Sequence, residues 1–232
     1  MKSFLMIGQS NMAGRGDFGE VPEIKNSSCF MLRNGRWQTM SEPINPDRAV
    51  FGTKFHSGVG LAASFADEYE KHFNDNVGLN PCADGGTSIS ERQPGEVLFD
   101  NAIAQAKLAQ RTSEIAGILW HQGENDSINK ADVEKYSERF KNTIDTLKNE
   151  LKLSADIPVI IGALGDFVGE YQNGKCRYFN EINAIIKELS TEYGAFVSAK
   201  DLTRKDDGIH FNSASYREFG KRYFTEYLKV IK

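Results

Sequence analysis

The sequence predicts a three-layer α/β/α sandwich built on a mostly parallel, doubly wound sheet. Short apolar runs alternate along the 232-residue chain with amphipathic patterns of helical spacing. Most of these runs lack the polar alternation of a half-exposed strand, as is typical of parallel strands covered on both faces. Hydrophobic residues make up 40% of the chain and charged residues 26%, so we expect one globular domain over residues 1–232.

The predicted strands are short apolar runs, each followed by a polar or glycine-containing segment. They cover residues 4–7, 29–32, 77–83, 117–120, 157–163 and 195–198. Between them, helices are expected to begin near residues 61, 97, 131, 178 and 213. Alternation of this kind predicts right-handed βα units, which place helices on both faces of the sheet.

Two of the predicted helices have a clear apolar stripe at intervals of three or four residues. In the helix near residue 131 the stripe consists of Val133, Tyr136, Phe140, Ile144, Leu147 and Leu151. In the last helix it consists of Tyr216, Phe219, Tyr223, Tyr227 and Val230. Asn212 or Ser213 is expected to cap the start of the last helix.

Composition excludes several classes of partner. With 28 basic and 32 acidic residues the formal net charge is -4, and no basic block is present, so we expect neither a nucleic acid nor a membrane as partner. Cys29, Cys82 and Cys176 lie at wide, unrelated spacings, which favours buried thiols in a reducing compartment. The apolar stretch at residues 4–7 is too short for a signal peptide. We therefore expect a cytoplasmic protein.

Polar segments follow the predicted strands, where parallel sheets bind their ligands. They supply a serine at a helix start, a glycine pair, a side-chain amide and a histidine preceded by an acid, which together are the groups of an acyl-transfer site. The segments are Gly8-Gln9-Ser10-Asn11-Met12, Asp84-Gly85-Gly86-Thr87, His121-Gln122-Gly123-Glu124-Asn125-Asp126 and Asp207-Gly208-Ile209-His210.

These segments resemble, in order and in spacing, the motifs of the SGNH (GDSL-like) hydrolases. Gln122 stands where the general superfamily pattern has an asparagine, and this favours the branch of sialate O-acetylesterases and acetylxylan esterases, carbohydrate esterase family six. The resemblance implies a flavodoxin-like fold and an esterase that removes O-acetyl groups from a sugar or oligosaccharide without metal or cofactor. It implies Ser10 as nucleophile and His210 as general base, with the Ser10 and Gly85 N–H groups and the Gln122 amide as the oxyanion hole.

Two assignments stay open in the sequence. Asp207 lies three residues before His210 and is favoured as its orienting acid, because a short tether limits the entropy lost on ordering, but Glu124 competes for the same ring. Gly85 is preferred to Gly86 as an oxyanion donor, because the resemblance implies a glycine two positions before a serine or threonine, here Thr87. Sugar contacts are expected from the irregular segment 15–57, where the candidates are Arg15, Asp17, Arg48 and Phe51.

Other interpretations are kept beside this one. Ser10 can serve as a helix N-cap, and Glu124 and Asp126 can simply make a loop soluble. His121, Glu124 and Asp126 carry groups that bind a divalent metal, although they follow a strand rather than share a helix face. A lysophospholipase, a thioesterase or a non-catalytic carbohydrate-binding module on the same fold are the alternative functions.

Overall fold

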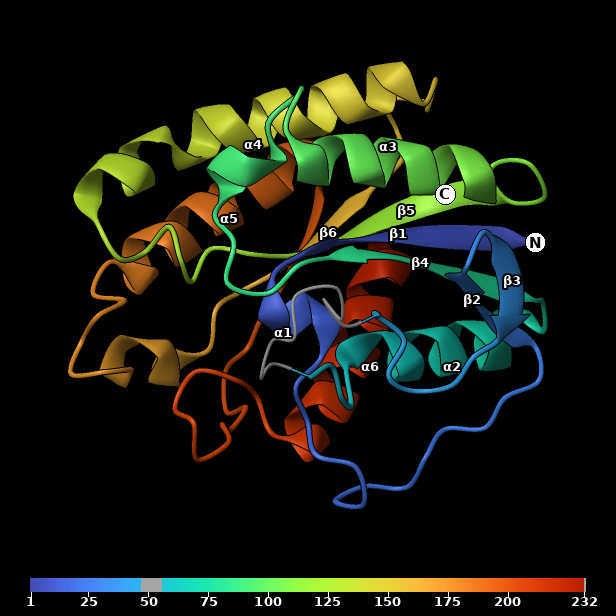
Figure 1. Ribbon diagram of the computed structural model, residues 1–232, viewed down its shortest axis with the longest axis horizontal. Helices are drawn as coiled ribbons and strands as arrows, with labels where there is room; N and C mark the ends of the chain where they lie inside the picture. Colours follow the sequence, from blue (N-terminus) through green and yellow to red (C-terminus); the bar gives the residue numbers. More distant parts are fainter. Residues whose placement is uncertain (47–55, 232) are drawn as a thin grey trace.

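The computed structural model describes residues 1–46 and 56–231 of the chain. A seven-stranded sheet forms its centre, in the order β3-β2-β4-β1-β5-β6-β7 (Figure 1). The strands are β1 (Lys2–Gly8), β2 (Cys29–Arg33), β3 (Arg36–Thr39), β4 (Val77–Ala83), β5 (Glu114–His121), β6 (Val159–Gly162) and β7 (Gly194–Val197). Only the β2–β3 pairing is antiparallel within this described part. The order β4-β1-β5-β6-β7 is the flavodoxin-like order, so the predicted fold class is confirmed.

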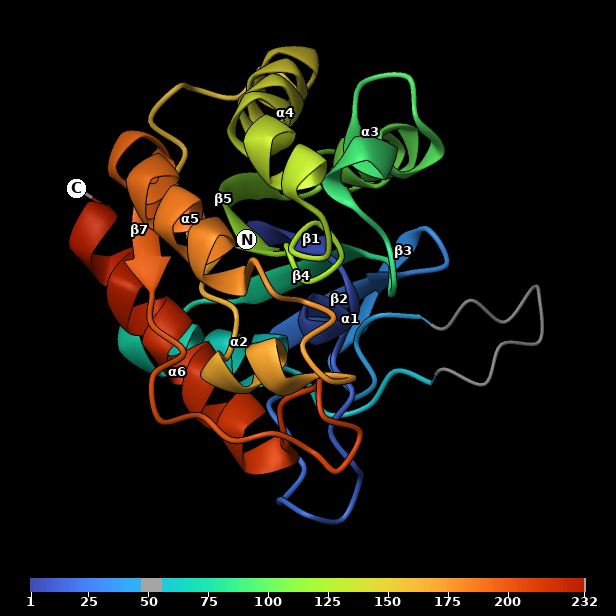
Figure 2. The ribbon, with the colours of Figure 1, turned by 90° about the vertical axis from the view of Figure 1, so that its left-hand side faces the viewer.

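Helices cover both faces of the sheet (Figures 1 and 2). They are α1 (Ser10–Ala13), α2 (Leu61–Phe73), α3 (Val97–Ala109), α4 (Lys130–Glu150), α5 (Phe179–Tyr193) and α6 (Ser213–Val230), with two 3₁₀ turns, η2 (Ile89–Arg92) and η3 (Asp166–Glu170). Helices α2 and α6 pack on one face, and α3, α4 and α5 lie on the other. The helices longer than one turn begin within one residue of the predicted positions.

Strand β1 shows why the apolar runs do not alternate with polar residues. Phe4 and Met6 point into the core beneath α2 and α6, whereas Leu5 and Ile7 point into the core beneath α3, α4 and α5. Both faces of the strand are therefore buried, and each position requires an apolar side chain. The predicted stripe of α4 is entirely buried in the second core.

The register of the sheet brings three strand ends to one level. Gly8, the last residue of β1, is paired with Ala83 at the end of β4 and with His121 at the end of β5. The segments that follow these strands therefore start side by side, which is the condition for a shared site. Ser10 and Gly85 each lie two residues beyond this level.

A β-hairpin at the sheet edge was not predicted. Strand β2 turns back through Asn34 and Gly35, which have φ angles of 53° and 74°, and continues into β3. Two successive positive φ angles characterise the tight turn that an Asn-Gly pair favours between antiparallel strands. The sequence therefore contained the signal, but β3 itself is only four residues long.

The predictions for the cap of the last helix and for the cysteine thiols are also confirmed. The side chain of Asn212 accepts a hydrogen bond from the Ser215 N–H at 2.9 Å, so Asn212 is the N-cap of α6. Cys29, Cys82 and Cys176 are free and buried. Across residues 1–46 and 56–231, every helix is too short or too polar to cross a membrane.

Candidate active site

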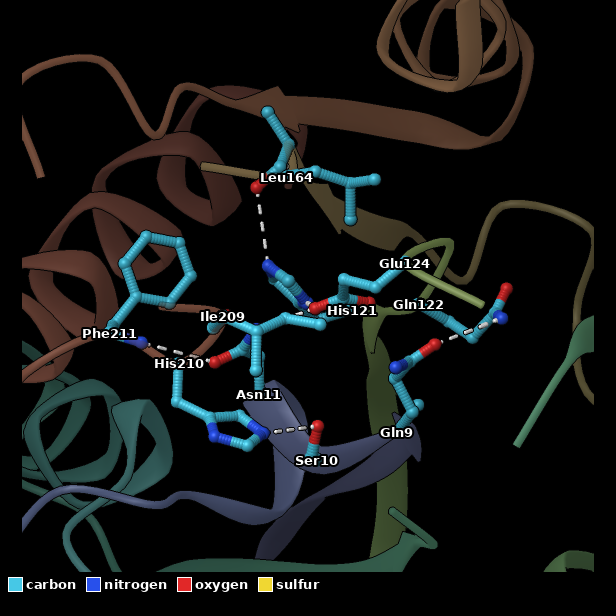
Figure 3. Close-up of polar contacts among 12 residues, drawn as sticks. Gln9, Ser10, Asn11, His121, Gln122, Glu124, Leu164, Ile209, His210 and Phe211 are labelled. Atoms are coloured by element: carbon cyan, nitrogen blue, oxygen red, sulfur yellow. Dashed lines mark hydrogen bonds and ion pairs between the residues drawn. The ribbon is translucent and has the colours of Figure 1, made fainter. Parts of the chain in front are cut away.

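The four predicted polar segments meet at the carboxyl-terminal edge of the sheet, around a cleft of about 670 Å³. Ser10, Gly85, Gly86 and His210 all line it. Figure 3 shows Ser10 and His210 facing each other, with Asn11 behind them. Residues separated by up to 200 positions in sequence therefore share one site.

Ser10 is the first residue of α1, directly after the central strand. The Gln9 carbonyl accepts hydrogen bonds from the N–H groups of Met12 and Ala13, both at 3.0 Å, so Gln9 holds the N-cap position. The interpretation of Ser10 as an N-cap is thus wrong. Its Oγ lies instead 2.9 Å from His210 Nε2. The hydroxyl is free of the helix and is presented to the imidazole.

Asp207 holds the other side of the His210 ring. Its Oδ2 lies 2.8 Å from His210 Nδ1, and its Oδ1 accepts the backbone N–H groups of Ile209 at 3.1 Å and His210 at 3.0 Å. Burial opposes ionisation of this carboxyl, but the hydrogen bonds from the ring and the backbone outweigh it and lower the pKa of Asp207 well below its usual range. The acid is therefore ionised and fixed in orientation.

Glu124, the competing acid, does not contact His210. Its carboxylate is buried and accepts a hydrogen bond from Asn11 Nδ2 at 2.6 Å. His121 Nδ1 lies 3.7 Å from the same oxygen, and burial lowers the pKa of His121 despite the opposing effect of the Glu124 charge. Of the two acids left open by the sequence, the geometry places Asp207 against His210.

Asn11, for which the sequence predicts no role, holds a central position in the site. Besides Glu124, its Nδ2 contacts the Ile209 carbonyl at 3.1 Å, and its Oδ1 accepts the Phe211 N–H at 3.3 Å. The Tyr216 hydroxyl donates to the same oxygen at 2.6 Å. Asn11 thus binds the backbone on both sides of His210. The sequence signal for this role is the position of Asn11 directly after the predicted nucleophile Ser10.

The two glycines of the second segment differ in environment. A methyl group placed on Gly85 would lie 3.4 Å from Ser10 Cβ and 2.5 Å from Arg15 Nη2. Gly86 has a φ of 74° and open space around it, and its carbonyl accepts from Asn125 Nδ2 at 2.7 Å. Gly85 is therefore the glycine packed against the serine, and Gly86 supplies the turn that requires a positive φ.

Gln122 lies away from the cleft surface. Its Nε2 donates to the Asp126 carboxylate and lies 3.4 Å from the Thr87 carbonyl oxygen, and the side chain is fully buried. Asp126 also accepts the Ile89 N–H at 3.0 Å. The Gln122 amide thus joins the loop after β5 to the glycine segment, and Gln122 is not among the residues that line the cleft.

His121, Glu124 and Asp126 do not converge as metal ligands would. His121 Nε2 lies 3.2 Å from the Ala163 carbonyl oxygen, and Asp126 faces Ile89. In the described part of the chain, no group of three or more His, Cys, Asp or Glu side chains is arranged to hold a metal ion. Glu124 and Asp126 are both buried, so their interpretation as residues that only make a loop soluble is wrong.

The predicted sugar contacts lie in different places. Arg15 lines the cleft and donates to the Ser57 hydroxyl at 3.3 Å. Asp17 forms an ion pair with Lys205 at 2.7 Å and is not among the residues that line the cleft. Arg48 and Phe51 lie outside the described residues.

Comparison with known proteins places the chain in a family. The sequence profile of the family described as "Carbohydrate esterase, sialic acid-specific acetylesterase" matches residues 1–229. The chain belongs to this family. As a carbohydrate esterase it is a carboxylic ester hydrolase, and the predicted resemblance to the SGNH carbohydrate esterases is confirmed. The Arabidopsis thaliana protein "Probable carbohydrate esterase At4g34215" is 29% identical over 244 residues, covering 97% of this chain and 89% of that protein.

Solved structures agree with this esterase in fold. The X-ray structure of the same Arabidopsis protein has a TM-score of 0.86 at 28% identity and covers 98% of both chains. NanS has a TM-score of 0.78 at 16% identity, with 98% of this chain and 96% of NanS covered. Axe2, an acetylxylan esterase from Geobacillus stearothermophilus, has a TM-score of 0.55 at 16% identity, with 97% of this chain and 92% of Axe2 covered.

Proposed function

We propose that this carbohydrate esterase removes O-acetyl groups from a sugar or oligosaccharide through an acetyl-enzyme formed on Ser10. The proposal is supported by two successive contacts that connect the nucleophile Ser10 through His210 to the acid Asp207. Ser10 Oγ lies 2.9 Å from His210 Nε2, and His210 Nδ1 lies 2.8 Å from Asp207 Oδ2. A serine nucleophile, its general base and an orienting acid require this arrangement.

Acylation begins when Ser10 Oγ attacks the acetyl carbonyl carbon and His210 Nε2 takes the hydroxyl proton. The ionised Asp207 accepts the Nδ1–H, which fixes the tautomer that leaves Nε2 free and stabilises the imidazolium that forms. The bond from the carbonyl carbon to the sugar oxygen then breaks, and the imidazolium gives its proton to that oxygen. In the second half His210 Nε2 takes a proton from a water molecule that attacks the acetyl-serine carbonyl carbon. The bond from that carbon to Ser10 Oγ then breaks, acetate leaves, and the imidazolium returns its proton to Ser10 Oγ.

The negative charge on the carbonyl oxygen requires donors that are already in place. The backbone N–H groups of Ser10 and Gly85 are assigned this role, because neither has an acceptor among the residues that the structure describes. Gly85 is also packed directly against Ser10. The Gln122 amide has two N–H groups, so it can act as the third predicted donor only if one of them turns toward the cleft from its present acceptors, which are Asp126, the Thr87 carbonyl and Gln9 Oε1.

The lining of the cleft supports a carbohydrate as substrate. Polar side chains enter it from several loops, among them Arg15, Asp84, Asn101, Asn125 and Lys175. Such groups can donate to and accept from sugar hydroxyls, and the apolar residues between them, such as Val97, Leu98 and Tyr171, can pack against the face of a sugar ring. NanS and Axe2 share the fold, and Axe2 is described as an acetylxylan esterase. The mechanism uses no metal and no cofactor.

A substrate panel tests the proposal. Acetylated xylo-oligosaccharides, O-acetylated sialic acids and p-nitrophenyl esters of increasing acyl length are compared with the wild-type protein and Ser10→Ala, with and without EDTA. We expect acetate release from an acetylated sugar, a steep decline with acyl length, no effect of EDTA and loss of turnover in Ser10→Ala. Rates that rise with acyl length would assign the protein to the lysophospholipase or thioesterase alternative. A folded wild-type protein that hydrolyses no ester would indicate a binding module.

A further inference from the structure

An enclosed arginine, Arg92, lies beneath the glycine segment and takes no part in the steps above. It ends η2, and only 2% of its surface is exposed. Its guanidinium donates to the Thr87 hydroxyl at 2.7 Å and to the carbonyl oxygens of Ser88 at 3.1 Å, Asp84 at 3.3 Å and Gly8. These acceptors are uncharged, and two of them, the Gly8 and Asp84 carbonyls, belong to the backbone of the segments that carry Ser10 and Gly85.

The contact with Asp84 determines where the Gly85 N–H points. The Asp84 carbonyl accepts from Arg92 and, at 2.6 Å, from the Thr87 hydroxyl, which itself accepts from Arg92. In a trans peptide the C=O and the following N–H point in opposite directions. Because the Asp84 carbonyl is held toward the buried guanidinium, the Gly85 N–H is directed away from Arg92, on the side of the peptide opposite the guanidinium.

The contact between Arg92 and the Gly8 carbonyl holds the backbone that leads into Ser10. The Gly8 carbonyl accepts from Arg92 and also from the Asp84 N–H at 3.0 Å. Gly8 ends the strand that leads into Ser10, and Asp84 begins the segment that leads into Gly85. One guanidinium group therefore ties together the two backbone segments whose N–H groups are assigned to the oxyanion hole.

On the basis of the proposed function, we propose that Arg92 is a positioning residue for the oxyanion hole. It holds the Gly85 N–H and the turn before Ser10 in the geometry that binds the tetrahedral oxyanion, and its enclosed positive charge favours that anion. Burial lowers the pKa of Arg92 to about 10, against the opposing charges of Asp84, Glu91 and Asp126, so the group stays charged at neutral pH. A fixed charge in a water-poor interior acts more strongly than one at the surface.

The variants Arg92→Lys and Arg92→Met separate positioning from general support. Lysine keeps the charge but loses the planar fork that reaches several carbonyls at once, and methionine loses both. The matched control is Arg217→Lys on α6. Arg217 is also largely buried and joins distant segments, through Glu42 at 2.9 Å and the Pro22 carbonyl at 3.3 Å, but it does not line the cleft.

We expect kcat for an acetyl ester to fall about tenfold in Arg92→Lys and about 10²-fold in Arg92→Met, with KM nearly unchanged, because an oxyanion interaction develops only in the transition state. The pH dependence of kcat/KM keeps the wild-type midpoint, since Arg92 does not contact Ser10, His210 or Asp207. Arg217→Lys lowers the unfolding temperature and leaves kcat unchanged.

Labelling of Ser10 by a fluorophosphonate provides a readout that does not depend on the substrate. Phosphonylation also places developing negative charge in the oxyanion hole, so Arg92→Lys should slow labelling by about the factor seen in kcat. A wild-type protein that is labelled but hydrolyses no acetyl ester would contradict the proposed substrate, while slower labelling of Arg92→Lys would still support the role of Arg92. A folded Arg92→Lys with wild-type kcat and wild-type labelling, or a wild-type protein not labelled at Ser10, would overturn the role of Arg92.

Discussion

Asn11 Nδ2 donates to Glu124 Oε1 across 2.6 Å, and this buried contact joins the residue after the nucleophile to the loop after β5. The same Asn11 side chain bonds the Ile209 carbonyl and the Phe211 N–H, the neighbours of His210 on either side. The connection from Glu124 to His210 therefore runs through Asn11. A charged acceptor in a low-dielectric interior makes such a bond stronger than a neutral pair.

Glu124→Gln is expected to lower kcat about tenfold and to reduce the free energy of unfolding by about 1.5 to 3 kcal/mol, because Asn11 loses its charged acceptor. Steady-state kinetics and urea unfolding measure the two effects. Glu218→Gln, which removes only an exposed partner of Arg222, serves as the control and should change neither appreciably. If Glu124→Gln impaired turnover more than Asp207→Asn, then Glu124 would be the acid that orients His210.

Asp207→Asn should lower kcat by about 10⁴-fold on correctly folded protein, as expected when the imidazole tautomer is no longer fixed. The pKa of Asp207 lies well below its usual range, so its carboxylate is charged throughout the working pH range and favours the imidazolium. Removing that charge makes the imidazolium harder to form, and the acidic limb of kcat/KM should shift to lower pH. An unshifted limb with most activity retained would exclude Asp207 as the orienting acid.

Asp126→Asn tests the buried carboxylate beneath the cleft by its effect on stability. Burial raises the pKa of Asp126 to about 6, despite the hydrogen bonds from Gln122 and the Ile89 N–H. Below the usual pKa near 4 both the folded and unfolded states hold the proton; between about 4 and 6 only the folded state does, so wild-type stability falls as pH rises through this window. The free energy of unfolding of Asp126→Asn, relative to that of the wild type, should therefore rise by on the order of 1 to 3 kcal/mol between pH 4 and pH 7. Urea unfolding of both proteins at pH 4 and pH 7 measures this change. The same difference in free energy of unfolding at the two pH values would contradict the raised pKa of Asp126.

Gln122→Ala distinguishes support from direct donation to the oxyanion. Because its amide faces Asp126 and Thr87 beneath the cleft, we expect a clear loss of stability and a change in kcat of less than about tenfold. Thermal unfolding, together with separate values of kcat and KM, distinguishes these two roles of Gln122. A loss of kcat of about 10²-fold at unchanged KM and unchanged stability would show that Gln122 is the third oxyanion donor.

The sequence predicted the fold well because its strands and helices have strong local signals. The runs that became β1 and β4 are apolar at nearly every position, and the stripes of α4 and α6 recur at helical spacing. Strand β3 was missed because its four residues, only partly buried, show neither pattern. The contact between Ser10 and His210 was expected from the motifs and their order, whereas the acid was left open between Asp207, which was favoured, and Glu124.

The supporting network could not be predicted, because its contacts depend on tertiary position. Asn11 and Glu124 are 113 residues apart, and Arg92 reaches the carbonyl of Gly8 84 residues away. An arginine between a glutamate and a glutamine gives no sign in sequence that it will be buried. The direction of the Gln122 amide was equally hidden, since a strand end fixes a position in the sheet edge but not a side-chain rotamer.

The central claim is that an acetyl-enzyme forms on Ser10, and trapping that intermediate tests it most directly. The protein is mixed rapidly with p-nitrophenyl acetate, quenched in acid during turnover, digested and mapped by mass spectrometry. We predict one acetyl group on the peptide that contains Ser10 in the wild-type protein, and none in Ser10→Ala. An acetyl group on a different residue, or continued turnover by folded Ser10→Ala, would contradict the account.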